Sequence, residues 1–201
     1  MADTWKWTPH SKLCFVTTGA TAPFTALIES ALSASSIDTL LKLGFTHLLI
    51  QYGTARDVYD KHSTTARDRL EQSGQKASMV VDGIDFDQDS LKSQFRLVQQ
   101  SKGIVISHAG SGTILSALRY QIPLIVVPNT ALLDNHQEEL AVAMERSNYL
   151  IRGDVQDLSP AIHKSSDFRV KMTQFPPTTS GKHRETKSFA AIMDETMGFM
   201  D

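Results

Sequence analysis

A glycine-rich turn behind a buried apolar run is the segment whose residue types best suit chemistry. The run Ile104–Ser107 is typical of a strand, and His108–Thr113 (HAGSGT) follows it directly. Gly110 and Gly112 would let the backbone approach a ligand closely, and a helix that begins here presents N–H groups and its positive dipole end to an anion. The segment therefore predicts a phosphate site suited to a diphosphate, with an ordinary tight turn as the structural alternative.

Other motifs for phosphate binding or nucleophilic catalysis do not fit this turn. A P-loop requires a Gly-Lys-Ser/Thr ending that is missing here, and the dinucleotide fingerprint requires glycine where Leu115 stands. A hydrolase elbow would need glycine at Ala109 and Thr113, so Ser111 lacks the surroundings of a serine nucleophile. We therefore interpret Ser111 as a phosphate ligand and favour neither ATP nor NAD.

A second polar constellation follows the next apolar run along the chain. It combines amide, imidazole and carboxylate groups in Asn129, Asp134, Asn135, His136 and Gln137. In one interpretation the amides and the imidazole bond sugar hydroxyls, because these groups offer both donors and acceptors. In the other, Asp134 caps a helix and Gln137 reaches back to it in a capping box. The two interpretations can hold together.

Two earlier loops are predicted to open at the same place. Thr17–Thr21 (TTGAT) follows the first apolar run and Gln51–Thr54 (QYGT) follows the second. A glycine in either loop is weak support for a site, because turns favour glycine whatever they bind. Since the carboxyl ends of parallel strands meet at one edge of a sheet, all four segments are expected to converge there. The candidates in these two loops are Gly19, Thr21, Gln51, Tyr52 and Gly53.

The acidic stretch Asp85–Asp89 (DFDQD) contains overlapping D-x-D spacings. In other transferases such carboxylates hold a divalent metal against a diphosphate. The stretch also precedes a predicted helix, and aspartates before a helix cap it and favour its positive end. The structural interpretation is preferred, so a divalent metal is compatible with the stretch but not indicated by it.

Short β-branched runs alternate with amphipathic segments of helical length. The predicted strands are Leu13–Thr17, His47–Gln51, Ser78–Val81, Ile104–Ser107 and Leu124–Val127. The predicted helices are Phe24–Leu43, Arg56–Gln72, Asp89–Ser101, Thr113–Gln121 and Asn135–Ser147. Strands that are apolar throughout are buried on both faces, so helices should cover both sides of the sheet. The pattern predicts an α/β fold with a doubly wound, mainly parallel, Rossmann-like sheet.

The pattern weakens after Ile151, and this sets the predicted domain boundary. Residues 1–151 would form the ligand-binding domain and residues 152–201 a C-terminal extension. Within the extension, Phe175–Gly181 (FPPTTSG) predicts a linker, because prolines and glycine disfavour both strand and helix. Arg184–Met200 predicts a terminal helix with one apolar face. That face would pack on its own domain, which we prefer, or on a partner chain.

Composition and charge limit the classes of partner. The 201 residues are 41% hydrophobic and 21% charged, as in globular proteins. A formal net charge of -2 and a pI near 6.4 give no overall attraction to nucleic acid or anionic lipid. Cys14 is the only cysteine, so no internal disulfide can form. No apolar run approaches the roughly 20 residues that span a bilayer, and the first residues do not resemble a secretory signal. We therefore expect a cytoplasmic protein with no membrane span and no nucleic-acid partner.

In combination, His108–Thr113, Pro123–Asn129 and Leu133–Gln137 (LDNHQ) resemble one known family. It is the family of catalytic subunits of the eukaryotic UDP-N-acetylglucosamine transferase that acts in dolichol-linked oligosaccharide assembly. Upstream, Phe15–Gly19 (FVTTG) and Ile50–Gly53 (IQYG) resemble the same family, and the similarity covers about Leu13 to Ile151.

The resemblance implies the donor-binding half of a GT-B glycosyltransferase, similar to that of the bacterial transferase that completes the peptidoglycan lipid precursor. The acceptor half would lie on a membrane-anchored second subunit, which recruits the chain to the cytosolic face of the endoplasmic reticulum. The implied reaction transfers N-acetylglucosamine from UDP to N-acetylglucosaminyl-diphosphodolichol with inversion. UDP-N-acetylglucosamine is the implied donor, and no cofactor is required.

The resemblance also suggests roles for the candidate residues. The start of the helix at His108, Ala109, Gly110, Ser111, Gly112 and Thr113 would bind the diphosphate, beside Gly19, Thr21 and Gly53. Asn129, Asn135, His136 and Gln137 would hold the sugar, with Asp134 also counted among the donor-binding candidates. Relatives of the donor-binding domain carry an acidic residue for the ribose hydroxyls, and the matching position here is Ser116, which cannot provide a charge-assisted pair of hydrogen bonds.

Three points stay open at the level of the sequence. The general base is expected on the partner subunit, with His108 and His136 as weaker candidates. A catalytically silent donor-binding or scaffold subunit would keep the same fold. So would a nucleotide-sugar enzyme that works alone.

Overall fold

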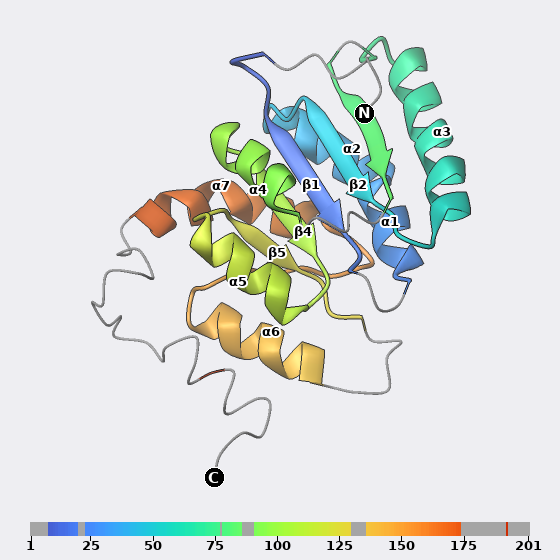
Figure 1. Ribbon diagram of the computed structural model, residues 1–201. Helices are drawn as coiled ribbons and strands as arrows, with labels where there is room; N and C mark the ends of the chain where they lie inside the picture. The colour runs from blue at the N-terminus through green and yellow to red at the C-terminus, as the bar shows by residue number, and fades with distance from the viewer. Residues whose placement is uncertain are drawn as a thin grey trace.

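The structure is a parallel β-sheet with helices on both faces (Figure 1). This computed structural model describes residues 8–19, 23–76, 78–85, 91–129, 136–173 and 192, with the backbone alone at 136 and 137. The strands of the described part are β1 (Leu13–Thr17), β2 (His47–Gln51), β3 (Val80–Ile84), β4 (Ile104–Ser107), β5 (Leu124–Val126) and β6 (Ile151–Arg152). Its helices are α1 (Thr25–Ala31), α2 (Ala34–Lys42), α3 (Arg56–Gln72), α4 (Lys92–Gln100), α5 (Ser111–Arg119), α6 (His136–Arg146) and α7 (Ser159–Thr173).

The strand order is β3-β2-β1-β4-β5-β6, and every neighbouring pair is parallel. The chain therefore moves outward from β1 in one direction and outward from β4 in the other. This confirms the predicted doubly wound sheet, and β1, β2 and β4 have the predicted bounds. Ligand crevices in such sheets open at the carboxyl ends of the strands where the order reverses, here between β1 and β4.

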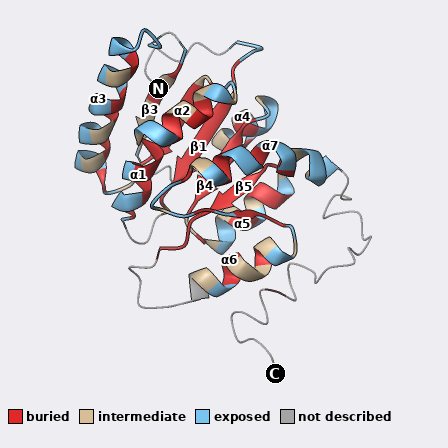
Figure 2. Ribbon diagram, turned by 180° about the vertical axis from the view of Figure 1, so that it is seen from behind, coloured by how far each residue is buried: buried red, intermediate tan, exposed pale blue. Residues whose placement is uncertain are grey.

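The alternating side chains of β1 show how the core is divided. Cys14 and Val16 pack with α1, α2, α3 and α7 on one face, whereas Leu13 and Phe15 pack with α4, α5 and α6 on the other. All of β1 is buried, and Figure 2 shows buried residues along the strands and on the inward sides of the helices. The central strand is therefore held from both sides, which fixes the positions of the loops at its end.

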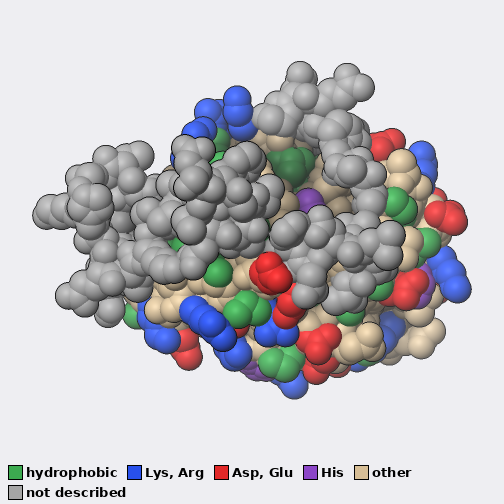
Figure 3. Space-filling view, turned by 90° about the horizontal axis from the view of Figure 1, so that it is seen from below, with side chains coloured by type: hydrophobic (Ala, Val, Ile, Leu, Met, Phe, Trp, Pro, Cys, Tyr) green, Lys and Arg blue, Asp and Glu red, His purple; other side chains and the backbone are tan. Residues whose placement is uncertain are grey.

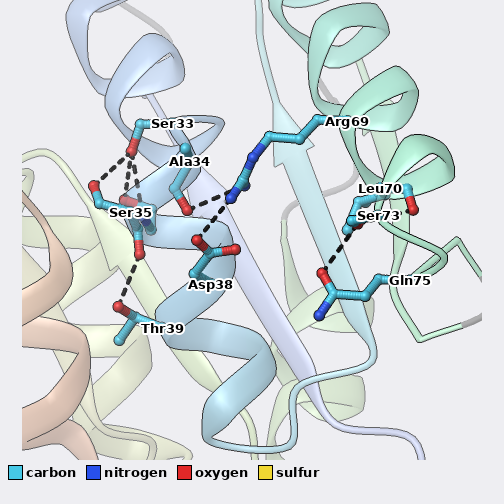
Figure 4. A network of polar contacts seen from close by, with 10 residues as sticks. Ser33, Ala34, Ser35, Asp38, Thr39, Arg69, Leu70, Ser73 and Gln75 are labelled. Atoms are coloured by element: carbon cyan, nitrogen blue, oxygen red, sulfur yellow. Dashed lines mark hydrogen bonds and ion pairs between the residues drawn. The ribbon is translucent and has the colours of Figure 1, made fainter.

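The prediction of one continuous helix over Phe24–Leu43 is wrong. The chain forms α1 and α2 with a break at Leu32 and Ser33, because Ser33 begins a new helix. Its hydroxyl accepts a hydrogen bond from the Ser36 backbone N–H at 3.3 Å, which is an N-cap contact (Figure 4). The helical spacing of apolar residues continues through the break, so spacing alone did not reveal it.

An ion pair joins α2 to α3 across the first face of the sheet. Arg69 donates to the Asp38 carboxylate at 2.7 Å and to the Ala34 carbonyl at 3.4 Å (Figure 4). Both charged side chains are about 40% exposed, so solvent screens the pair and its contribution to stability is below about 1 kcal/mol.

The edge strand β3 lies two residues later than the predicted Ser78–Val81 and extends through Gly83 to Ile84. Only one side of it pairs with the sheet, so its residues are partly exposed and the apolar pattern that marks buried strands is weak. Two side chains cover the outer side. Arg67 donates to the Val81 carbonyl at 3.0 Å, and the Asp82 carboxylate accepts the Gly83 N–H at 2.8 Å.

The extension after Ile151 contains elements that the sequence did not predict. Strand β6 pairs with β5, and α7 then returns to the first face, where Ala161, Ile162 and Phe168 enter the core. Residues on both sides of the predicted boundary thus share one core, and the division itself stays a prediction. The predicted linker 175–181 and the predicted helix 184–200 lie outside the described residues, except that Ile192 is helical and buried. Within the described part, no helix has the length and apolar character that a membrane span requires.

Candidate functional site

The predicted loops meet at the carboxyl edge of the sheet. In Figure 1 the strands point towards this edge, and Figure 3 views the molecule from that side. The segments after β1 and β4 are neighbours here, since Thr17 pairs with Ser107 in the register of these strands. The segments after β2 and β5 flank them, on the β1 and β4 sides respectively.

The His108 ring lies between two glycines from different loops. A methyl group added to Gly19 would lie 2.4 Å from Cε1 of the ring, and one added to Gly110 would lie 2.4 Å from Nε2. Both distances are far inside van der Waals contact, so each glycine is required to leave space for the ring. Gly19 also has φ of +82°, a conformation that other residues rarely adopt. The imidazole therefore joins the end of β1 to the start of α5 by packing.

Burial lowers the pKa of His108, and a hydrogen bond to the Thr17 backbone partly offsets this by raising it. The Ser107 hydroxyl lies 3.4 Å from the Nδ1 atom of the ring. With its pKa below the ordinary value for histidine, the ring is mostly neutral at pH 7. An anion placed beside it would favour the charged form and raise the pKa again.

Helix α5 begins beside this ring with its first N–H groups directed out of the helix. The Gly110 carbonyl accepts from the N–H groups of Thr113 and Ile114, both at 3.1 Å. The N–H groups of Ser111 and Gly112 precede the first bond of the helix and have no carbonyl one turn earlier to bond. Both residues are exposed, and no atom lies within 4 Å of a methyl group added to Gly112. The start of α5 is therefore open to a ligand, as an anion site requires.

Hydrogen bonds hold the ends of β1 and β2 together beneath these loops. Thr17 donates its hydroxyl to the Gln51 side-chain oxygen at 2.5 Å, and Thr18 donates to the Gln51 carbonyl at 3.2 Å. Gly53, with φ of +55°, lies close to the β1 loop, because a methyl group on it would be 3.7 Å from the Gly19 carbonyl oxygen. The side chain of Gln51 is thus engaged in support of the two loops.

Tyr52 is held from behind by residues that the sequence analysis did not single out. Its ring stacks on Tyr59 with centroids 5.0 Å apart, and Arg67 donates to the Tyr59 hydroxyl at 3.0 Å. Tyr59 in turn lies over Gly83, where a methyl group would be 2.3 Å from the ring. A tyrosine seven positions after Tyr52, in a charged helix, carries no sequence signal for this role.

The remaining described candidates are less exposed than Ser111 and Gly112. Ala109 is buried in the core on the α5 side, so it can offer only its backbone. Thr113 is half-buried in the first turn of α5, and Asn129 is buried just beyond β5. Ser116 is half-buried, and its hydroxyl donates to the Gly112 carbonyl at 2.9 Å, one turn earlier in the same helix. Its hydrogen-bonding proton is therefore already committed to the helix.

Several predicted site residues lie outside the described part of the chain. They are Thr21, Asp134 and Asn135, together with the side chains of His136 and Gln137. The acidic stretch is described only at Asp85. Among the described residues, no group of three or more His, Cys, Asp and Glu side chains lies close enough to hold a metal ion. The roles proposed for all of these residues stay predictions.

The described geometry suits the binding of an anionic ligand rather than covalent catalysis. Backbone N–H groups at a helix start can stabilise negative charge that develops on a leaving group. The Ser111 hydroxyl is at the helix start with no hydrogen bond to a histidine among the described contacts, so activation as a nucleophile has no structural basis there. The start of α5 at this edge of the sheet is thus suited to an anionic ligand.

Comparison with known proteins places the chain in a family. Residues 13–193 match the glycosyltransferase family 28 C-terminal domain. The chain is 38% identical to the UDP-N-acetylglucosamine transferase subunit ALG13 of Yarrowia lipolytica over 94% of its length and 86% of the relative. It is 31% identical to the protein of the same name from Cryptococcus neoformans, over 94% of this chain and 98% of the relative.

Two solved structures have a similar fold. A solution structure of ALG13 aligns with a TM-score of 0.59 and 31% identity, covering 79% of this chain and 87% of that one. The crystal structure of MurG from Acinetobacter baumannii aligns with a TM-score of 0.55 over 87% of this chain and 46% of that one. At 15% identity the likeness to MurG concerns the fold alone.

The contact between His108 and Gly110 predicts a strong energetic coupling. Gly110→Ala should destabilise the fold, since the new methyl group overlaps the ring, whereas the same change in a His108→Ala background should cost much less. A double-mutant cycle from urea unfolding should give a coupling energy above about 1 kcal/mol. Additive effects of the two changes would show that the ring does not depend on Gly110 for its place.

Proposed function

Because the chain belongs to the family of glycosyltransferase family 28 C-terminal domains and is a glycosyltransferase, we propose that it is the catalytic subunit of a UDP-N-acetylglucosamine transferase. The observation that carries the proposal is the open start of α5, which lies beside a neutral histidine at the point where the strand order reverses. Relatives with this printed activity match the chain over 94% of its length, so the whole described fold is shared rather than a short motif.

In the proposed reaction, N-acetylglucosamine passes from UDP to N-acetylglucosaminyl-diphosphodolichol. An acceptor hydroxyl attacks the anomeric carbon from the side opposite UDP, so the configuration inverts. The bond to the diphosphate breaks, its electron pair stays on the phosphate oxygen, and the acceptor proton passes to a general base. The N–H groups of Ser111 and Gly112 stabilise the growing negative charge at the helix start. No metal or other cofactor is required.

The acceptor half of the active site belongs to a second, membrane-anchored subunit in this proposal. Support comes from the relatives, which are named as subunits. The general base is then a residue of the partner. That subunit recruits the chain to the cytosolic face of the endoplasmic reticulum and presents the lipid-linked acceptor.

Transfer of labelled N-acetylglucosamine should require both subunits. We expect product when the chain and the membrane-anchored subunit are assayed together with the dolichol-linked acceptor, and none with either alone. Product from the isolated chain would overturn the shared active site. Absence of product with the partner, under conditions where the chain binds donor, would identify a silent donor-binding subunit instead.

A negative charge at the start of α5 should abolish donor binding while leaving the fold intact. Ser111→Asp suits the helix end, because its dipole favours an acidic residue there, but it repels a diphosphate. Calorimetry with UDP-N-acetylglucosamine should show at least about a hundredfold loss of affinity. The matched control is Ala34→Asp, which adds the same charge at the start of α2 and should bind donor as the wild type does. Equal affinities for the two variants would refute this phosphate site.

Donor affinity should rise as the pH falls, because of His108. Burial keeps its pKa below the ordinary value in the free chain, and the diphosphate raises it in the complex, so binding takes up a proton. The donor affinity begins to rise as the pH falls through the pKa of His108 in the complex. It stops rising once the pH is below the pKa of His108 in the free chain. An increase of about tenfold corresponds to one pKa unit. UDP-N-acetylglucosamine suits the measurement, because its diphosphate is esterified at both ends and therefore keeps the same charge over the pH range in which histidine titrates.

His108→Gln should flatten this pH dependence. His62→Gln should leave it unchanged, because His62 lies on α3 and pairs with Glu29, with 3.8 Å between Nε2 and Oε1. A wild-type affinity that does not vary with pH would show that the ring does not sense the diphosphate.

A further inference from the structure

The turn between β2 and α3 brings Gly53 to the proposed donor site. Few interactions within the turn itself fix its position. The Ala55 N–H donates to the Tyr52 carbonyl at 3.0 Å, which closes a four-residue turn, and α3 follows with no side-chain cap at Ala55. Gly53 at the centre of the turn has φ of +55° and no side chain to anchor it. Beyond the hydrogen bonds that Gln51 makes to Thr17 and Thr18, the position of Gly53 beside the Gly19 carbonyl is therefore set by Tyr52.

Tyr52 is fixed on two sides. Its N–H donates to the Ile84 carbonyl at the end of β3 at 3.1 Å, which sets the backbone. Its ring stacks on Tyr59 at an interplanar angle of 25°, which sets the side chain. Both rings are buried, at 8% and 5% exposure, so this is an interior contact and not a surface one. Stacked aromatic pairs of this kind contribute energy beyond the area that they bury.

Tyr59 is itself held in one orientation. Its ring occupies the space that Gly83 leaves open, and its hydroxyl accepts a hydrogen bond from Arg67. The same guanidinium donates to the Val81 carbonyl through Nη2 at 3.0 Å and Nε at 3.3 Å. Arg67 thus connects strand β3 to Tyr59. The Tyr59 ring cannot change its orientation without breaking these contacts or striking the backbone of β3.

From these contacts we infer that Tyr59 is a positioning residue for the donor site: it fixes the Tyr52 ring, and through it the place of Gly53 opposite Gly19. The inference rests on the proposed donor-binding function and extends it to a residue that lies behind the site. Tyr59 touches no donor. It acts by keeping the β2 side of the crevice at a constant distance from the phosphate side, which is where small displacements reduce binding.

Tyr59→Leu should weaken binding of UDP-N-acetylglucosamine to the full chain by about tenfold in calorimetry. Tyr59→Phe keeps the ring against Tyr52 and Gly83 and loses only the hydroxyl, so it should bind within about twofold of the wild type. In transfer assays with the partner subunit, Tyr59→Leu should raise KM for the donor and leave kcat nearly unchanged, because the loss is equal in ground and transition states.

A matched control separates positioning from a general loss of stability. Phe45→Leu also shortens a fully buried aromatic side chain of the same core. Phe45, however, lies just before the amino end of β2, whereas the proposed site is at the carboxyl ends of the strands. It should lower the thermal unfolding temperature as Tyr59→Leu does, without changing donor affinity. If the two variants bind donor equally well, Tyr59 has no positioning role. If the wild-type chain does not bind the donor at all, the proposed function itself fails, and this inference with it.

Discussion

The His108 ring occupies space that a methyl group on either Gly19 or Gly110 would fill. This fit joins two loops that belong to different halves of the sheet, and the hydrogen bond between His108 and the Thr17 backbone acts in the same direction. The neutral state of the ring follows from the same burial, because desolvation disfavours the imidazolium. The packing of one ring thus both positions the start of α5 and favours a neutral imidazole beside it. In the proposed function, a phosphate that enters would meet N–H groups already directed towards it, and little reorganisation would be needed.

The rest of the sheet serves this constraint by keeping β1 and β4 in register. A methyl group on Gly103 would lie 1.9 Å from the Leu13 carbonyl, so the two strands also approach closely at their beginnings. Between the two ends, β1 is buried on both faces by helices from each layer. The hydrogen bond between Thr17 and Gln51 then joins the carboxyl end of β1 to that of β2. Each loop at the edge therefore starts from a strand that cannot shift.

The sequence predicted the central strands because they are apolar throughout, and β1, β2 and β4 begin and end where expected. It failed where tertiary contacts decide the outcome. The break at Ser33 lies inside an unbroken apolar spacing, and β6 and α7 have too weak a pattern to be recognised. The glycines and His108 were chosen as candidates from their types and positions, but their contact with one another was not predicted. Tyr59 and Arg67 were missed, because their importance comes from what they touch and not from what they are.

The outer side of β3 is occupied by the molecule's own polar groups. Residues 81 and 83 direct their backbone groups away from β2, since alternate residues of a parallel strand face opposite sides. The Arg67 guanidinium takes the first outward carbonyl, and the Asp82 carboxylate takes the next outward N–H. An extended peptide would have to displace both ions before it could hydrogen-bond to this strand. Association of two molecules through this strand edge is thereby disfavoured.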